Sequence, residues 1–257
     1  MTDLVELTSS AHGDLRILQD AKTKFAADQH VLALRANEVG QAASCFAVFF
    51  TRSQQTGDAA LSAITSISPG NNLFVKDGVW TATHEPSIMQ TYPFFLMRAD
   101  NQEKGYTVGV DADSAALSRS EGEPLFQENG QPSMHLSKIT SVLEANLEHD
   151  VQTRLFTESV EKLGLQKSVN LVVYLQNGES QTITGLRTID EDKLKSLDAK
   201  VLQDLNAKGY LVAIHAMLLS IFQLNLLIRR YNEAGAGPTI NQIKLEVARS
   251  AAGEPLS

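Results

Sequence analysis

Cysteine is nearly absent from this chain of 257 residues, and its scarcity excludes several kinds of site at once. A single thiol, that of Cys45, cannot form an intramolecular disulfide or a zinc site built from several cysteines. Cys45 lies in the apolar stretch "AASCFAVFF", where no cationic neighbour in the sequence would lower its pKa. We therefore interpret it as a small core residue rather than a reactive thiol.

Runs of basic residues are also lacking. The chain has 22 Lys and Arg against 30 Asp and Glu, a formal net charge of −8. This balance argues against a nucleic-acid-binding protein and against docking on an anionic membrane, because both targets need a basic face. The first residues, "MTDLVELTSS", include acidic side chains and no uninterrupted apolar core, so we expect no secretory signal. These features predict a cytoplasmic protein, with a non-classical association with the cell surface left open.

Long hydrophobic runs are limited to one, from Leu211 to Ile228. It is about long enough to span a bilayer. Polar residues interrupt it, namely His215, Ser220, Gln223 and Asn225. Because polar groups at bilayer depth are expensive, we predict a buried helix of a soluble core and no integral membrane segment.

Familiar catalytic motifs are missing too, since the sequence contains no G-x-S-x-G, Walker or G-x-G-x-x-G pattern. His12-Gly13-Asp14 has the form that opens a facial triad for iron, but it precedes every convincing strand. The acidic residues and His149 within 144–150 lack the Glu-x-x-His spacing of a di-iron bundle and fit a solvated helix face. We assign no catalytic residue, no metal site and no cofactor.

The patterns that are present indicate an α+β fold. Short apolar runs between residues 15 and 111 predict a largely antiparallel β region, with strands in "CFAVFF", "ALSAITSI", "YPFFLMRA" and "GYTVGVD". An apolar stripe from Ile139 to Val160 predicts an amphipathic helix, with Ser133 or Ser137 as its N-cap. A β-hairpin at Asn177-Gly178 and the apolar C-terminal helix follow. We expect one domain over 1–230, β-rich about 12–111 and helix- and hairpin-rich about 112–230, with 231–257 as a loosely attached tail.

Aromatic residues are few, and many of them gather in "NNLFVKDGVWTATHEPSIMQTYPFFLM" at 71–97, which holds the only tryptophan, Trp80. Turn chemistry in "SPGNN" and "KDG" predicts a tightly folded crossing between strands. Two hypotheses remain open for this segment. Its aromatic side chains Trp80, Tyr92 and Phe94 either present a surface for a protein partner or fill the core.

Three polar residues support an enzymatic alternative. His84 and Glu85 lie beside Trp80, and His215 lies on the most apolar helix. If these three side chains met in one pocket, they would form a site of the oxygenase-like or hydrolytic kind. The more ordinary interpretation is a solvated turn for the first two and a satisfied core histidine for the third. We retain all three as candidate binding residues.

Several blocks of the sequence resemble the bacterial SapC family. "NLFVKDGVWTATHEPSIMQTYPFFL" is similar to its signature segment, and "HGDLRI", "PGNNLF", "EPLFQENGQPS", "TIDEDKLKSLD" and "LNAKGYLVAIHAMLLSIFQLNLLI" follow the family order across about 12–230. This chain departs from the family at Glu38-Val39 and Cys45–Phe49, where the family has Glu-Phe and then Tyr-Pro-Ile-Val-Phe. A buried strand is kept, but the proline and the tyrosine hydroxyl are lost.

The resemblance implies a link to surface-layer formation and serum resistance, with no catalytic residues to transfer. A transporter permease shares the family's name, but it would need several apolar spans and cannot describe this chain. We therefore predict a non-catalytic binding or accessory protein that assists surface-layer or surface-protein assembly or export. Its partners would be proteins of unknown identity.

Overall fold

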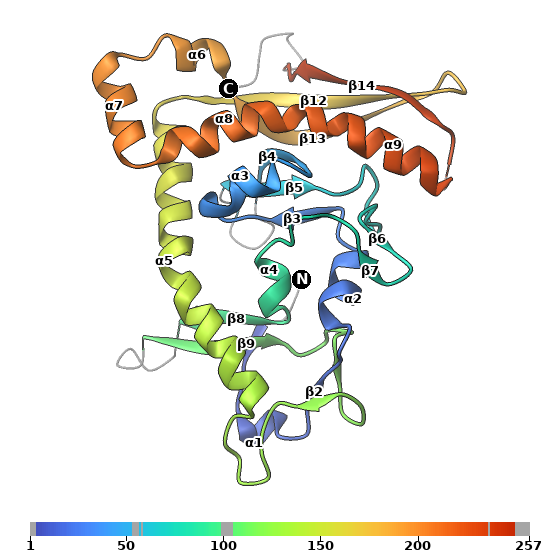
Figure 1. Ribbon diagram of the computed structural model, residues 1–257, viewed down its shortest axis with the longest axis vertical. Helices are drawn as coiled ribbons and strands as arrows, with labels where there is room; N and C mark the ends of the chain where they lie inside the picture. The colour runs from blue at the N-terminus through green and yellow to red at the C-terminus, as the bar shows by residue number, and fades with distance from the viewer. Residues whose placement is uncertain (1–3, 53–56, 58, 99–104, 236, 250–257) are drawn as a thin grey trace.

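The computed structural model describes residues 4–52, 57, 59–98, 105–235 and 237–249. Figure 1 shows a six-stranded sheet with helices at one end of the molecule, smaller sheets at the other, and the long helix α5 running between them. The predicted α+β class is confirmed. Most of the polar segments "TRSQQTGD" and "DNQEKG", and the end of the predicted tail, lie outside the described residues.

The six-stranded sheet has the order β14-β12-β13-β4-β5-β3, and all of its pairs are antiparallel. Its strands are β3 (Val31–Ala33), β4 (Ala47–Arg52), β5 (Ala59–Ile64), β12 (Gln166–Leu175), β13 (Ser180–Ile189) and β14 (Ile240–Val247). The hairpin predicted at Asn177-Gly178 joins β12 to β13, and Gly178 has the positive φ of 86° that favours glycine. Val48, Phe49 and Phe50 of β4 are fully buried, as the continuous apolar run predicts.

The segment after residue 230 is more ordered than the sequence suggested. We expected 231–257 to be a loosely attached tail, but β14 pairs with β12 from Val169↔Val247 to Leu175↔Ile240. Ile240 is buried and Ile243 and Leu245 are partly buried, while Gln242, Lys244 and Glu246 alternate with them as exposed residues. The prediction was wrong because the small and turn-forming residues of "AGAGPT" suggested an irregular tail, and the strand that follows them is short. Its pairing with β12, which lies far away in the sequence, stabilises this strand.

The region 15–111 also contains more helix than the sequence suggested. The strands of residues 4–124 that lie outside the large sheet form two small three-stranded sheets and a hairpin. They comprise β1 (Leu4–Glu6), β2 (Arg16–Ile17), β6 (Val75–Lys76), β7 (Val79–Trp80), β8 (Phe94–Arg98), β9 (Tyr106–Asp111), β10 (Leu117–Ser118) and β11 (Glu123–Pro124). Short helices interrupt them, namely α1 (Ser9–His12), α2 (Ala21–Ala27), η1 (Ala36–Glu38), α3 (Val39–Ala42) and α4 (Ile88–Thr91). These helices are too short for a clear 3.6-residue period, so their sequence pattern did not reveal them.

The helix α5 (Met134–Lys162) links two hydrophobic clusters. Ser133 is its N-cap, and its side chain accepts a hydrogen bond from the backbone N–H of Leu136. Leu136, Ile139 and Leu143 pack in the cluster below the large sheet, with Phe94 and Val110. Phe156 and Val160 belong instead to the cluster on the large sheet. The apolar stripe predicted for this helix is therefore divided between two packing partners.

The remaining helices lie beside the large sheet, at the upper end of Figure 1. They are α6 (Glu191–Lys195), α7 (Ala199–Ala207), α8 (Tyr210–Ser220), η3 (Ile221–Gln223) and α9 (Leu224–Ala234). Ser220 is fully buried and satisfied, since its hydroxyl donates to the carbonyl of Met217 and accepts from the N–H of Val48. This contact ties α8 to β4 of the sheet.

The apolar C-terminal helix is buried along one face only. By length and composition, the stretch Tyr210–Ala234 could cross a membrane, and 33% of its most apolar window is buried in the molecule. Ala213, Ile214 and Met217 face the sheet. The expectation of a helix enclosed in the core is thus corrected, because the sheet supplies a packing surface on one side and nothing among the described residues covers the other.

Candidate functional site

The aromatic segment 71–97 is chiefly core. Phe74 and Phe94 are buried, and Trp80 is half-buried with its ring centroid 6.0 Å from that of Phe46 and 6.3 Å from that of Phe74. The indole Nε1 of Trp80 donates to the carbonyl of His84 at 3.0 Å. The turn at Asp77-Gly78 has positive φ at both residues, which suits the tight β6–β7 hairpin. Most of the aromatic surface of this segment is therefore already engaged within the chain.

Tyr92 is also occupied. Its hydroxyl donates to Oδ2 of Asp111 at 3.0 Å, and its ring stacks on Phe25 with centroids 3.8 Å apart. Burial raises the pKa of Tyr92, and the adjacent carboxylate of Asp111 contributes in the same direction. This tyrosine joins β9 and α2 to the segment, which is a structural task.

His84 is held by a buried carboxylate, that of Glu38, whose residue is only 7% exposed. Glu38 Oε2 accepts from Nε2 of His84 at 3.2 Å and from the N–H of Ser87 at 2.9 Å. Its Oε1 accepts from Oγ of Ser87 at 2.7 Å and from the N–H of Arg35 at 2.8 Å. Since a carboxylate can only accept, Nε2 of His84 carries the proton in this pair.

Arg35 and Asp150 complete what we call the Glu38 cluster, which comprises Arg35, Glu38, His84, Ser87 and Asp150. The guanidinium of Arg35 donates through Nε to Oδ1 of Asp150 at 2.6 Å and through Nη1 to Oγ of Ser87 at 2.6 Å. The cluster thereby joins η1, the loop before α4 and the middle of α5. Every lone-pair direction of the Glu38 carboxylate has a donor, so its evident role is to join η1 to the loop before α4, while Arg35 adds the link to α5.

Glu85 and His215 do not join His84. Glu85 accepts from Nζ of Lys22 at 2.7 Å, which links it to α2. His215 is exposed on α8, and its Nδ1 donates to the carbonyl of Leu211 at 2.7 Å. Each of the three residues has a different partner, and among the described contacts no hydrogen bond connects any two of them. These hydrogen bonds therefore do not bring the three side chains together, as an enzymatic pocket would require.

Cys45 lies next to this region and is buried, as the sequence suggested. Burial raises the pKa of its thiol, but hydrogen bonds outweigh that effect and the pKa lies below its ordinary value. The donors are the hydroxyls of Ser44 and Thr83 and the backbone amides of Thr83 and His84. The sequence holds no cation near Cys45, and it could not reveal these donors because Thr83 and His84 reach the thiol only through the fold.

Metal ligands do not gather within the described ranges, where no group of three or more His, Cys, Asp or Glu could hold an ion. His12 accepts from the N–H of Thr8 through Nδ1, and Asp14 pairs with Arg119.

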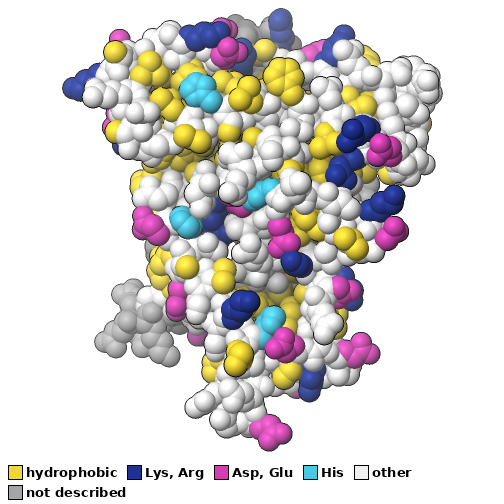
Figure 2. Space-filling view, viewed as in Figure 1, with side chains coloured by type: hydrophobic (Ala, Val, Ile, Leu, Met, Phe, Trp, Pro, Cys, Tyr) yellow, Lys and Arg dark blue, Asp and Glu magenta, His cyan; other side chains and the backbone are white. Residues whose placement is uncertain are grey.

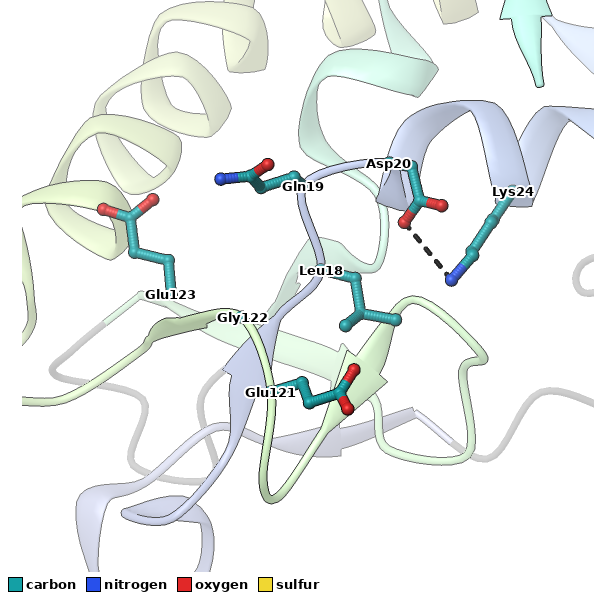
Figure 3. A pocket seen from close by; sticks show the side chains of 7 residues that line it. All are labelled: Leu18, Gln19, Asp20, Lys24, Glu121, Gly122 and Glu123. Carbon is teal, nitrogen blue, oxygen red and sulfur yellow. Dashed lines mark ion pairs between the residues drawn. The ribbon is translucent and has the colours of Figure 1, made fainter.

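A cavity of about 770 Å³ lies at the start of α2. Figure 3 shows the side chains of Glu121, Glu123 and Asp20 around it pointing in different directions, with Asp20 paired to Lys24. None of the predicted site residues lines this cavity.

An exposed apolar face lies on the outer side of α8 and η3. We call it the α8 stripe, and it consists of Val212, His215, Leu219 and Phe222. The three apolar residues are 70, 66 and 72% exposed in that order. Spacings of three, four and three residues place all four on one face over about 15 Å. Figure 2 shows hydrophobic side chains gathered over α8 at the upper end of the molecule, with a histidine among them.

Sequence reasoning found only part of these two features. It selected His84 and His215 but missed Arg35, Glu38 and Ser87, whose spacing in the sequence carries no motif. It also treated Val212, Leu219 and Phe222 as core. A signal was present, because the run Leu211–Ile228 is apolar all round and a helix on the surface of one sheet cannot bury every face.

The fold and contacts described above define an α+β protein with a polar cluster that serves as a structural clamp and, among its described residues, an exposed apolar face on one helix. A model of the SapC family matches residues 7–227, and the chain belongs to the SapC family. No curated protein and no solved structure matches the chain.

Proposed function

We propose that this SapC-family chain is a non-catalytic protein-binding component that engages another protein through the α8 stripe. The observation that carries the proposal is the exposure of Val212, Leu219 and Phe222 on one helix face. Contiguous apolar patches on a soluble protein typically mark interaction surfaces. Aromatic side chains at the centre of such patches contribute much of the binding free energy, which makes Phe222 the expected anchor.

The remainder of the structure supports a binding role more than a catalytic one. The polar groups of the Glu38 cluster already have partners, and the aromatic segment that the sequence singled out is packed against the sheet. The other exposed large apolar side chains of the described residues are scattered: Val79 lies on β7, Tyr106 on β9 and Val247 on β14, while Met134 and Leu155 lie on α5 but 21 residues apart. Within the part of the chain that the structure describes, α8 and η3 alone collect several such side chains along one face.

The family resemblance suggests where this binding is used. We propose that the chain acts in the cytoplasm as an accessory protein in surface-layer or surface-protein assembly or export. An acidic chain is suited to a soluble accessory role, because its net charge of −8 limits non-specific adhesion to nucleic acids and anionic lipids. The stripe would provide the specific contact.

Site-specific photo-crosslinking in the native cell tests this proposal. A photoreactive phenylalanine analogue replaces Leu219 in the full chain, and a matched control carries the analogue at Met134, which is 87% exposed at the start of α5. We expect a discrete crosslinked protein from position 219, weakened by Phe222→Glu, and no such product from position 134. Identical products from both positions, or none from position 219, would contradict the proposal.

The enzymatic alternative rests on His84, Glu85 and His215, and it has less support. A pocket built from them would need side chains that approach one another, whereas Glu38, Lys22 and the carbonyl of Leu211 are their respective partners. A hydrolytic or oxygenase activity that disappeared in His84→Gln while the protein stayed folded would revive it.

A further inference from the structure

We propose that the protein seated on the α8 stripe is a second copy of this chain, packed with its α8–η3 segment antiparallel to the first. This inference rests on the proposed function and names the occupant of the same surface. Three observations support it: the charge along the helix, the order of side-chain sizes along the stripe, and the open space beside Val212.

Charge favours a neutral partner at this surface. Two copies that each carry −8 would repel one another wherever acidic residues met, but no Asp, Glu, Lys or Arg occurs between Leu211 and Ile228. The charged residues nearest in sequence, Lys208 and Arg229, are paired within the chain to Asp204 and Glu233. An anionic membrane would find no basic residue on the stripe, so a second neutral stripe is the better match.

Side-chain size favours an antiparallel arrangement. A two-fold axis midway between His215 and Leu219 would place Val212 of one copy opposite the partner subunit's Phe222 and repeat the same contact in the other half. His215 would likewise face the partner's Leu219. The small Val212 would then meet the large Phe222 in both halves, because a two-fold axis repeats every contact between residues i and j as one between j and i. A parallel pair would instead place Phe222 against Phe222 and Val212 against Val212.

Gly40 provides room for the larger side chain. It lies on α3 beside Val212, and a Cβ built there would meet Cγ1 of Val212 at 3.9 Å and, outside its own helix, no other atom of the described residues within 4 Å. Gly40 is exposed, so this space opens to the surface. The ring of Phe222 from a second copy, lying against Val212, would occupy the space above Gly40 like a knob in a shallow hole.

The available area is consistent with a weak, reversible dimer. From their exposed fractions, Val212, Leu219 and Phe222 present on the order of 400 Å² of apolar surface, about half of the roughly 800 Å² per partner that a standard interface buries. The rest would come from His215 and from a polar rim that includes Gln41 and Asn225, both exposed. We expect dissociation in the micromolar range, because binding must offset the lost freedom of two chains.

Sedimentation equilibrium of the purified full chain tests the dimer. We expect reversible dimerisation that Phe222→Glu and Gly40→Trp each weaken at least tenfold, the first by placing a charge in the contact and the second by filling the hole. Met134→Glu, a comparable change on α5, serves as the control and should leave dimerisation unchanged. Circular dichroism of each variant checks its fold, which exposed sites should preserve. A wild-type monomer throughout the micromolar range overturns the inference, as does equal weakening by all three changes.

Disulfide trapping tests the orientation. The chain carrying His215→Cys is mixed with the chain carrying Leu219→Cys, while buried Cys45 is retained. An antiparallel pair should form the mixed disulfide in preference to either symmetric one, since residue 215 faces the partner's residue 219. Preference for the two symmetric disulfides would overturn the antiparallel arrangement.

The outcomes separate this inference from the proposed function. A monomer whose position 219 still crosslinks to a different protein refutes the second copy and leaves the binding role intact. A monomer without any such crosslink refutes both. A monomer that binds neutral phosphatidylcholine vesicles, and loses that binding in Phe222→Glu, refutes both in favour of a lipid surface.

Discussion

Replacing Glu38 with alanine is the sharpest test of the polar clamp, because one carboxylate accepts four hydrogen bonds that join the η1 turn to the loop at 84–87. Those bonds come from the N–H of Arg35, the N–H and Oγ of Ser87, and Nε2 of His84. Glu38→Ala removes every acceptor and leaves the donors at a site that is 7% exposed. The damage should therefore be much larger than that of an ordinary Glu→Ala change.

The magnitude follows from these contacts. A hydrogen bond to a charged group contributes about 1.5 to 3 kcal/mol, but water entering the space can satisfy some of the four donors. Counting about half of them as lost, we expect Glu38→Ala to lower the free energy of unfolding by about 4 kcal/mol. Glu38→Gln should cost about 2 kcal/mol, since the amide oxygen still accepts from Arg35 and Ser87 while the amide nitrogen opposes the N–H of Ser87.

Urea unfolding, followed by the fluorescence of Trp80 and by circular dichroism, provides the measurement. Thermal unfolding should show a loss in Tm of about 10 °C for Glu38→Ala. Glu158→Ala is the matched control, because its carboxylate is 64% exposed and pairs only with Arg154 on the surface of α5. It should change stability by less than about 0.5 kcal/mol. The reasoning would be refuted if Glu38→Ala matched this control, or if glutamine cost as much as alanine.

Two further predictions concern Cys45 and Trp80. The pKa of the folded Cys45 thiol lies below its ordinary value of about 9, so the folded state favours the thiolate. The free energy of unfolding should therefore rise as the pH is raised from 7 to 9. Urea unfolding at these two pH values should show this rise in the wild type and not in Cys45→Ala. If the pH dependence of the two proteins coincides, the donors around the thiol do not stabilise its ionised form. Trp80→Ala should lower the free energy of unfolding by about 3 kcal/mol, because it removes a ring packed against Phe46 and Phe74, and should leave crosslinking from position 219 intact in the molecules that remain folded. Loss of that crosslink without loss of stability would contradict the core role and indicate that Trp80 contacts the partner.

Local chemistry was enough to predict several elements before any contact was known. Asn177-Gly178 predicted the β12–β13 hairpin, Ser133 was one of two proposed caps for α5, and "CFAVFF" predicted a fully buried strand. Each of these signals lies within a few neighbouring residues, because turns, caps and buried strands are set by nearby backbone and side-chain preferences. The family blocks added identity, and the family model over 7–227 confirms them.

Contacts between distant segments decided the rest. Glu38 bonds to His84 and Ser87, which lie more than 45 residues away in the sequence, and Arg35 bonds to Asp150, which lies 115 residues away. No short sequence pattern could therefore predict the clamp. The strand β14 likewise forms by pairing with β12, which lies more than 60 residues earlier in the chain. Burial of the helix after Gly209 also depends on how much sheet lies beneath it. A sheet covers one side of a helix, and so the tertiary structure, rather than the apolar sequence, determined that Val212, Leu219 and Phe222 face outward.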